Sequence, residues 1–189
     1  MTPEEIWKEA AGGSQKAWTE VYRLFGGRLY QFFLKNTGRT SQAMDMAQEV
    51  FERIWRHRAD FRTGRLQTWI FRIARNLLID EWRRKGRSEV LVEEVPENVD
   101  PQSHVEATVI DRLEQDEAAK LIDATLTKLS DDDRLVIGLV YLGGLSFPEL
   151  AEVMEIPLGT AKTRVRQARL RLESHMRDQM HGRSAGEAQ

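Results

Sequence analysis

Few side chains in this sequence of 189 residues stand at a spacing that catalysis or metal binding requires. The four histidines include no pair at the i, i+4 spacing of a helical metal site; they are His57, His104, His175 and His181. The sequence contains no cysteine, which excludes disulfides and thiolate metal sites. The run Asp131–Asp133 could bind a cation. It follows Ser130 at the start of an apolar helical segment, so helix capping and the helix dipole also explain it.

Binding chemistry is concentrated near the end of the sequence, in the stretch GLSFPELAEVMEIPLGTAKTRVRQARLRL at residues 144–172. Ser146 and Glu149 have the S-x-x-E spacing of a capping box, which predicts the start of a short apolar helix. The segment EIPLG then predicts a turn that contains glycine, and Thr160 is placed to cap a second helix. Two short helices joined by a tight turn are typical of a helix-turn-helix.

The second of these helices carries a dense run of cations. They fall within ten residues: Lys162, Arg164, Arg166, Arg169 and Arg171. At about 100° per residue, one stripe is expected to pack on the first helix, and it consists of Ala161, Val165, Ala168 and Leu172. The centre of the opposite face is polar: Thr163, Arg166 and Gln167. Polar readers between two cationic flanks suit a DNA major groove with its phosphate walls. The alternative is a solvated basic face, and groove reading does not account for Leu170, which also points outward.

The elements that must position this helix are also helical. Apolar residues recur at helical spacing from the first residues onward, and no segment alternates apolar and polar residues as a strand would. We expect one helix to end at Gly12-Gly13, another at Gly26-Gly27, and a third at Gly38. Two longer helices follow, in SQAMDMAQEVFERIWRH and in TWIFRIARNLLIDEWRRK, with Thr68 as the cap of the second.

The charges are strongly segregated, although the net charge is only −2. Residues 62–87 carry a net charge of +6, residues 88–133 a net charge of −11, and residues 162–177 a net charge of +5. Residues 88–104 contain two prolines, five acidic residues and neither Lys nor Arg, which is typical of a linker. We therefore expect an all-α protein of two small helical domains, residues 1–87 and 113–180, the second containing the helix-turn-helix. An acidic linker at 88–112 joins them, and a flexible tail covers 181–189.

The last helix of the first domain has a second candidate binding face. Two apolar stripes bury it on two sides, with Trp82 in the core, and leave one polar stripe: Arg72, Asn76, Asp80 and Arg83. A basic loop precedes it, with the sequence FRTGRLQT, which has a glycine turn and contributes Arg62 and Arg65. An amide and a carboxylate beside a basic loop could hold an unpaired base by its edge.

Three segments together resemble the sigma-70 family of bacterial RNA polymerase factors, and specifically its extracytoplasmic-function (ECF) branch. They are DMAQEVFERIW, TWIFRIARNLLIDEWRR and LSDDDRLVIGLVYLGGLSFPELAEVMEIPLGTAKTRVRQARLRL, which span nearly the whole chain in the order that the family has. The resemblance implies a factor that binds RNA polymerase core, reads the −35 and −10 promoter elements and helps to open the duplex. It also implies an anti-sigma factor as a further partner.

The resemblance assigns roles to positions in this sequence. The polymerase-binding residues it implies are Asp45, Gln48, Glu49 and Glu52. The opposite, apolar face of that helix is expected to be Met44, Ala47, Val50, Phe51, Ile54 and Trp55. The −10 element would meet Phe61, Arg62, Arg65, Arg72, Asn76, Asp80 and Arg83. The −35 element would meet Thr160, Lys162, Thr163, Arg164, Arg166, Gln167, Arg169 and Arg171. For the acidic face, ordinary solvation is the alternative.

Two positions depart from the family pattern. Gln167 stands where arginine is usual, which changes the expected base preference, since glutamine pairs with adenine and arginine with guanine. Ala161 stands where valine is usual, which affects only packing.

Two other classes of function stay open at this point: a helix-turn-helix regulator that acts without polymerase, and an enzyme acting on nucleic acid. We expect a cytoplasmic protein with no cofactor, no metal site, no catalytic activity and no segment inserted in a membrane.

Overall fold

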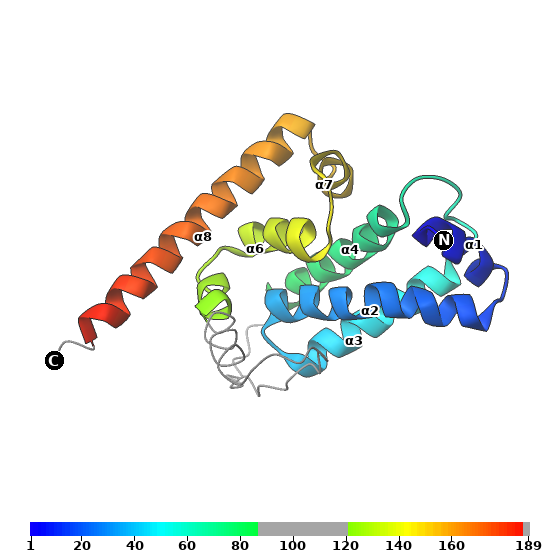
Figure 1. Ribbon diagram of the computed structural model, residues 1–189, viewed down its shortest axis with the longest axis horizontal. Helices are drawn as coiled ribbons and strands as arrows, with labels where there is room; N and C mark the ends of the chain where they lie inside the picture. Colours follow the sequence, from blue (N-terminus) through cyan, green and yellow to red (C-terminus); the bar gives the residue numbers. More distant parts are fainter. Residues whose placement is uncertain (87–120, 187–189) are drawn as a thin grey trace.

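The computed structural model describes residues 1–86 and 121–186, and every regular element within these ranges is a helix (Figure 1). The first half contains α1 (Pro3–Ala11), α2 (Gln15–Thr37), α3 (Thr40–Arg56) and α4 (Leu66–Gly86). The second contains α6 (Asp131–Ile137), the π-helical turn η1 (Gly138–Leu142), α7 (Phe147–Met154) and α8 (Leu158–Gly186). The all-α prediction is confirmed. The expected linker lies outside the described residues, and α8 extends into the range where we expected a flexible tail.

Several helix ends follow local sequence signals. Thr2 and Glu5 form a reciprocal capping box at α1, in which the Thr2 N–H donates to Glu5 Oε2 at 2.7 Å. Gly38 ends α2 with a left-handed φ of 70°, and its N–H donates to the Leu34 carbonyl. The predicted end at Gly26-Gly27 is wrong, because α2 continues through both glycines. Each glycine costs about 1 kcal/mol relative to alanine, and burial of apolar residues on both sides of the pair offsets this cost.

Two other predicted caps are also wrong. The helix α4 begins at Leu66 rather than after Thr68, and its first N–H donates to Glu4 Oε1 of α1 at 3.0 Å. The turn between α7 and α8 is centred on Glu155, whose φ of 56° is left-handed, and not on glycine. The helix α8 already begins at Leu158, so Thr160 lies within its first turn. In both cases the helix starts earlier than local sequence signals indicated.

The two halves share one continuous apolar cluster. The first half contributes the large side chains of α2 and α4, among them Phe32, Phe33, Ile70 and Phe71. The second half contributes Leu135, Leu139, Leu145, Leu150 and Val153 to the same cluster. At Gly138, where η1 crosses α2, a Cβ atom would lie 3.0 Å from the Phe32 ring, so a larger residue here would force that ring to shift. The second half is therefore packed on the first by its core and not only by surface contacts.

The helix-turn-helix lies at the edge of this arrangement. The helix α7 packs between α4 and α8, while α8 also packs on α6 and then projects away from the other helices (Figure 1). A smaller apolar cluster joins α8 to α6, and it consists of Leu126, Leu129, Ile137 and Ala168, with Leu172 beside them. Among the described helices, none has both the length and the apolar character needed to cross a membrane.

Candidate nucleic-acid and polymerase interfaces

The inward stripe of α8 is as the periodicity predicted. Ala161, Val165 and Ala168 are buried, and Leu172 is half-buried. The residues predicted to face outward are all exposed: Thr160, Lys162, Thr163, Arg164, Arg166, Gln167, Arg169 and Arg171. The side chain of Leu170 is also exposed, at 48%. The polar face of α8 is therefore presented to solvent.

The cations of α8 differ in what they contact. Within residues 1–86 and 121–186, Lys162, Arg164 and Arg166 have neither an ion pair nor a side-chain hydrogen bond. Arg169 pairs with Glu173 one turn later, at 3.1 Å between Nε and Oε1. Arg171 contacts α6, where its Nη1 lies 2.8 Å from both carboxylate oxygens of Asp133. Sequence periodicity placed these five on the outward side of α8, at its polar centre and on its two flanks, and could not distinguish the paired from the unpaired ones.

The run Asp131–Asp133 forms the first turn of α6, and Ser130 caps this helix. Ser130 Oγ accepts the Asp133 N–H at 3.2 Å, as the capping pattern predicted. Asp131 lies 3.5 Å from Arg134, and the Asp133 side chain pairs with Arg171. Within the part of the chain that the structure describes, no group of three or more acidic or histidine side chains is arranged to hold a metal ion.

The polar stripe of α4 divides into an open part and a covered part. Asn76 and Asp80 are exposed; Asn76 accepts a hydrogen bond from Arg75 at 3.0 Å, and Asp80 lies 3.8 Å from Arg83. In the loop before α4, Arg62 is exposed and Gly64 has a φ of 98°, as expected for a glycine turn. These residues are accessible for binding.

Phe61, which we predicted to meet the −10 element, packs against other aromatic rings. It is half-buried and packs in tilted or edge-on geometry against Trp7 and Trp69, with ring centroids 6.3 Å and 5.4 Å apart. Phe61 packs on the edge of the aromatic core beside α1, where Trp7 and Trp69 also contact each other, with ring centroids 5.4 Å apart. Its ring is therefore not freely presented for stacking on a base.

Arg72 of this stripe, together with Thr68 and the loop residue Arg65, meets the carboxylates of α7. Glu149 Oε1 accepts a hydrogen bond from Thr68 Oγ1 at 3.0 Å and lies 3.1 Å from Arg65 Nε. One turn further along α7, Glu152 pairs with Arg72. Burial alone would raise the pKa of the Glu149 carboxyl, but hydrogen bonds from Ser146 and Thr68, with the Arg65 charge, outweigh it and lower that pKa. Arg65 and Arg72 thus contact protein carboxylates in this arrangement.

Backbone carbonyls complete the contact between the halves. Arg28 of α2 donates from Nε to the Leu142 carbonyl at 3.0 Å and from Nη2 to that of Gly143, at the end of η1. Its guanidinium also lies 5.5 Å from the ring centroids of Phe25 and Phe71, and desolvation lowers its pKa from the ordinary value. The amide of Gln67 donates to the Gly144 carbonyl at 2.9 Å. Local sequence signals did not indicate any of these contacts.

The acidic face of α3 is mainly exposed. Asp45, Gln48 and Glu52 point to solvent, and Gln48 donates to Glu52 at 3.1 Å. Glu49 is half-buried and accepts from Arg53 Nε at 3.0 Å. Three of the four predicted residues are therefore available to a partner without breaking an ion pair.

The predicted apolar face of α3 is partly wrong. Met44 is 60% exposed and Trp55 41% exposed, whereas Ala43 and Met46 are buried. The buried stripe is centred on Ala43, Ala47, Val50 and Ile54, which places Met44 and Trp55 about a quarter-turn away from it. Phe51 stays buried at this edge because the rings of Trp18 and Tyr22 cover it. Together with Trp55, these rings line a surface hollow of about 460 Å³ beside Gln48 and Glu52.

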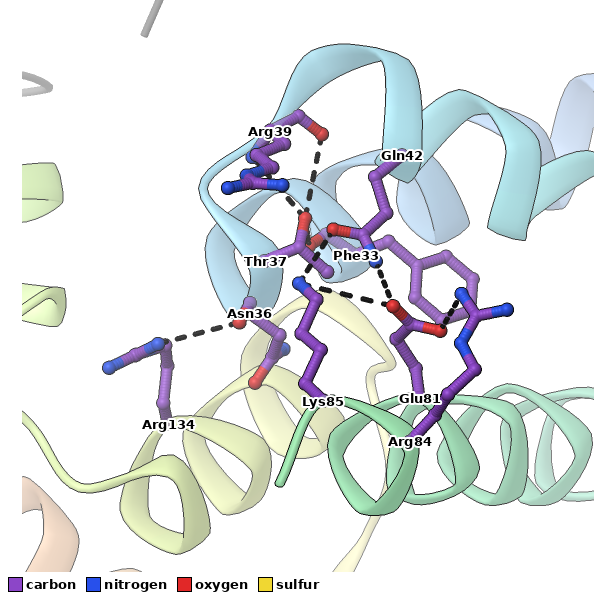
Figure 2. A network of polar contacts seen from close by, with 9 residues as sticks. All are labelled: Phe33, Asn36, Thr37, Arg39, Gln42, Glu81, Arg84, Lys85 and Arg134. Atoms are coloured by element: carbon purple, nitrogen blue, oxygen red, sulfur yellow. Dashed lines mark hydrogen bonds and ion pairs between the residues drawn. The ribbon is translucent and has the colours of Figure 1, made fainter. Parts of the chain in front are cut away.

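A polar network fixes α3 relative to α4 (Figure 2). Gln42 of α3 donates to Glu81 of α4 at 2.6 Å and accepts from Lys85 at 2.9 Å, while Arg84 pairs with the other oxygen of Glu81 at 2.5 Å. The side chain of Glu81 is only 11% exposed. The network connects the two helices that carry the acidic face of α3 and the open polar stripe of α4.

Comparison with known proteins finds two families in the same order as the two halves. Residues 21–88 match the model of sigma-70 region 2, and residues 109–172 match that of sigma-70 region 4. The ECF RNA polymerase sigma factor SigW of Bacillus subtilis (strain 168) is 33% identical over 177 residues, which cover 90% of this chain and 95% of that protein. The ECF sigma factor RpoE of Cereibacter sphaeroides is 31% identical, with 86% and 87% covered.

A solved structure shows the same fold. The sigma factor RpoE from Bartonella quintana, crystallised in complex with the anti-sigma factor NepR, matches with a TM-score of 0.67 and 26% identity. The match covers 86% of this chain and 98% of that chain. Both halves of the molecule, and not only the helix-turn-helix, therefore have counterparts in known proteins.

Proposed function

The chain belongs to the ECF sigma factors of the sigma-70 family. On this premise we propose which of its surfaces binds each partner in transcription initiation. Members of this family associate with RNA polymerase and direct initiation at specific promoters. They are non-catalytic initiation factors, so the polymerase performs the chemistry. We infer that the same holds for this chain and that it acts in the cytoplasm, with an anti-sigma factor as a regulator.

Three surfaces carry the proposed functions. The exposed face of α3, with Asp45, Gln48 and Glu52, binds the polymerase core. Arg62 in the loop before α4 and the open stripe of α4 bind the melted −10 element. The outward face of α8 lies in the major groove of the −35 element. The observation that carries this proposal is the match to SigW over nearly the full length of both chains, with both sigma regions in order.

Binding at the −10 element supplies the free energy for opening. Extruding a base from the duplex costs a few kcal/mol, which contacts to the extruded base and the displaced strand can offset. Asn76 and Asp80 offer an amide and a carboxylate for base edges, and Arg62 offers a cation for the backbone. Arg65 and Arg72 meet α7 carboxylates in the arrangement described here, so their part in −10 binding requires α7 to move off α4.

The test is reconstituted transcription. Start sites mapped after overproduction of the protein supply the promoters, and purified core polymerase with and without the full chain is then assayed on them. We expect transcripts that depend on the chain and a one-to-one complex with core. Duplex DNA binding that needs no core, together with no transcript, would instead support a helix-turn-helix regulator.

A second assay addresses the −10 assignment. Variants at Asn76, Asp80 and Arg62 are compared on duplex promoters and on promoters with a pre-melted −10 bubble. A residue that acts in melting is rescued by the bubble, whereas a residue that reads a base is not. Normal transcription of duplex templates by all three variants would show that the −10 surface lies elsewhere.

A further inference from the structure

Five cations in the first half of α8 separate into two groups along the helix. The unpaired ones, Lys162, Arg164 and Arg166, fall in the first turns, and within the described ranges none of them contacts an acidic side chain. The paired ones, Arg169 and Arg171, follow in the next turn and contact carboxylates of the protein itself. A recognition helix contacts base edges chiefly through its N-terminal residues, so the unpaired group stands where DNA contacts are expected.

The contact between Arg171 and Asp133 joins two helices. One nitrogen, Nη1, lies 2.8 Å from both oxygens of a carboxylate whose side chain is 13% exposed. Asp133 is held in turn by its backbone, since its N–H donates to the Ser130 hydroxyl at the N-terminus of α6. A charge-assisted contact to a carboxylate fixed in this way has defined geometry at both ends.

The surroundings of Arg171 are unfavourable for a DNA phosphate. The first turn of α6 contains Asp131, Asp132 and Asp133, three consecutive carboxylates on the element that Arg171 contacts. Arg134 offsets part of this charge through its 3.5 Å contact with Asp131, and the positive end of the helix dipole adds only about half an elementary charge. A phosphate placed on Arg171 would meet like charges, which weaken rather than strengthen such a contact.

A small apolar cluster lies beside the contact between α8 and α6. Its buried members are Leu126 and Leu129, which precede α6, Ile137 of α6 and Ala168 of α8. Apolar contacts of this kind are not directional. The pair of Asp133 and Arg171 adds a directional contact between α6 and α8.

We propose that Asp133 and Arg171 form a strut that sets the orientation of α8, and that direct −35 contacts are confined to Thr160–Gln167. The proposal rests on the proposed function of α8 as the −35 reader. It assigns Asp133 as a positioning residue in promoter binding and removes Arg171 from the phosphate contacts predicted from periodicity.

The decisive variant is Asp133→Asn, because the two roles of Arg171 predict opposite signs. If Asp133 only competes with a phosphate for Arg171, its neutralisation releases the guanidinium and tightens promoter binding. If the pair is a strut, neutralisation weakens binding. We expect weaker binding by holoenzyme, measured with the full chain and core polymerase on a promoter of mapped −35 element. The double variant Asp133→Arg with Arg171→Asp should restore much of the affinity, which a variant that is merely misfolded would not do.

The salt dependence of affinity gives an independent readout. Loss of one phosphate contact lowers the slope of log affinity against log salt concentration by about 1. We expect that decrease for Lys162→Ala and Arg164→Ala, and an unchanged slope with reduced affinity for Arg171→Ala. Tighter binding by Asp133→Asn, or a slope lowered by Arg171→Ala, would overturn the strut. If Lys162→Ala, Arg164→Ala and Arg166→Ala all leave affinity and slope unchanged, the assignment of α8 to the −35 element fails, and the strut with it.

Discussion

Thr68 of α4 donates its hydroxyl hydrogen bond to Glu149 of α7, 81 positions later in the chain, at 3.0 Å. The same carboxylate lies 3.1 Å from Arg65 and also accepts the hydroxyl and backbone N–H of Ser146. Glu149 thus caps its own helix and connects that helix to the proposed −10 surface. The α7 carboxylates therefore compete with nucleic acid for the Arg65 and Arg72 side chains.

Reversal of the charge at Glu152 should make the −10 surface more accessible. Glu152→Lys replaces attraction to Arg72 by repulsion and changes an exposed side chain, so the fold is expected to persist. We expect the full chain to bind a single-stranded −10 oligonucleotide several-fold more tightly, measured by fluorescence anisotropy. Glu155→Lys is the matched control, since it makes the same charge change at the end of α7, at an exposed residue. Equal gains in the two variants would indicate a general charge effect rather than release of α7.

The stability of the fold should depend on the ionisation of Glu149. Its pKa is lowered in the folded state from the ordinary value of 4.5, because the donors around it outweigh burial. The carboxylate therefore contributes stability that is present above the ordinary pKa and is lost as the pH falls through the lower folded-state pKa. Glu149→Gln should reduce the acid dependence of the free energy of unfolding in this range, measured by urea denaturation at successive pH values. Thr68→Val removes one hydrogen-bond donor to Glu149 and should reduce this pH dependence in part. A pH dependence of unfolding that is unchanged in both variants would contradict the stabilising role of the Glu149 carboxylate.

Reversal of charge on α3 should weaken polymerase binding without loss of stability. Asp45→Lys and Glu52→Lys change exposed side chains that face away from the core. We expect reduced affinity for core polymerase in a competition assay, and an unchanged melting temperature. Phe51→Ala is the contrasting control: its ring is 7% exposed, and its removal should cost about 3–5 kcal/mol of stability. Full core affinity in the double variant of Asp45 and Glu52 would place the docking surface elsewhere.

The base preference at the −35 element should follow residue 167. Gln167 is exposed on the outward face of α8, and glutamine prefers adenine where arginine prefers guanine. Gln167→Arg restores the residue usual in the family and should change the preference at one base position by about 1–3 kcal/mol. A panel of promoters with single −35 substitutions measures this shift. A uniform change across the panel would identify residue 167 as a backbone contact.

Local sequence signals predicted much of the fold because helix formation depends on near neighbours. The capping pairs at Thr2 and Ser146 and the end of α2 at Gly38 each involve residues within four positions of one another. The buried stripe of α8 follows from the period of 3.6 residues alone. Local signals misled where burial overrode them. The helix α2 continues through Gly26-Gly27 because both sides of the pair are anchored in the core.

The sequence by itself determined the helical class, the helix-turn-helix and the outward face of α8, since each is encoded in periodicity and capping over short distances. Only the tertiary structure decided which charges stay available for binding. Arg164 and Arg171 lie seven positions apart on the same flank, yet one is unpaired within the described residues and the other contacts Asp133 on α6. Likewise, Asn76 is exposed and Arg72 meets Glu152 on the same stripe of α4. Ion pairs between distant segments depend on how helices pack, and side-chain periodicity along one helix contains no information about its partners.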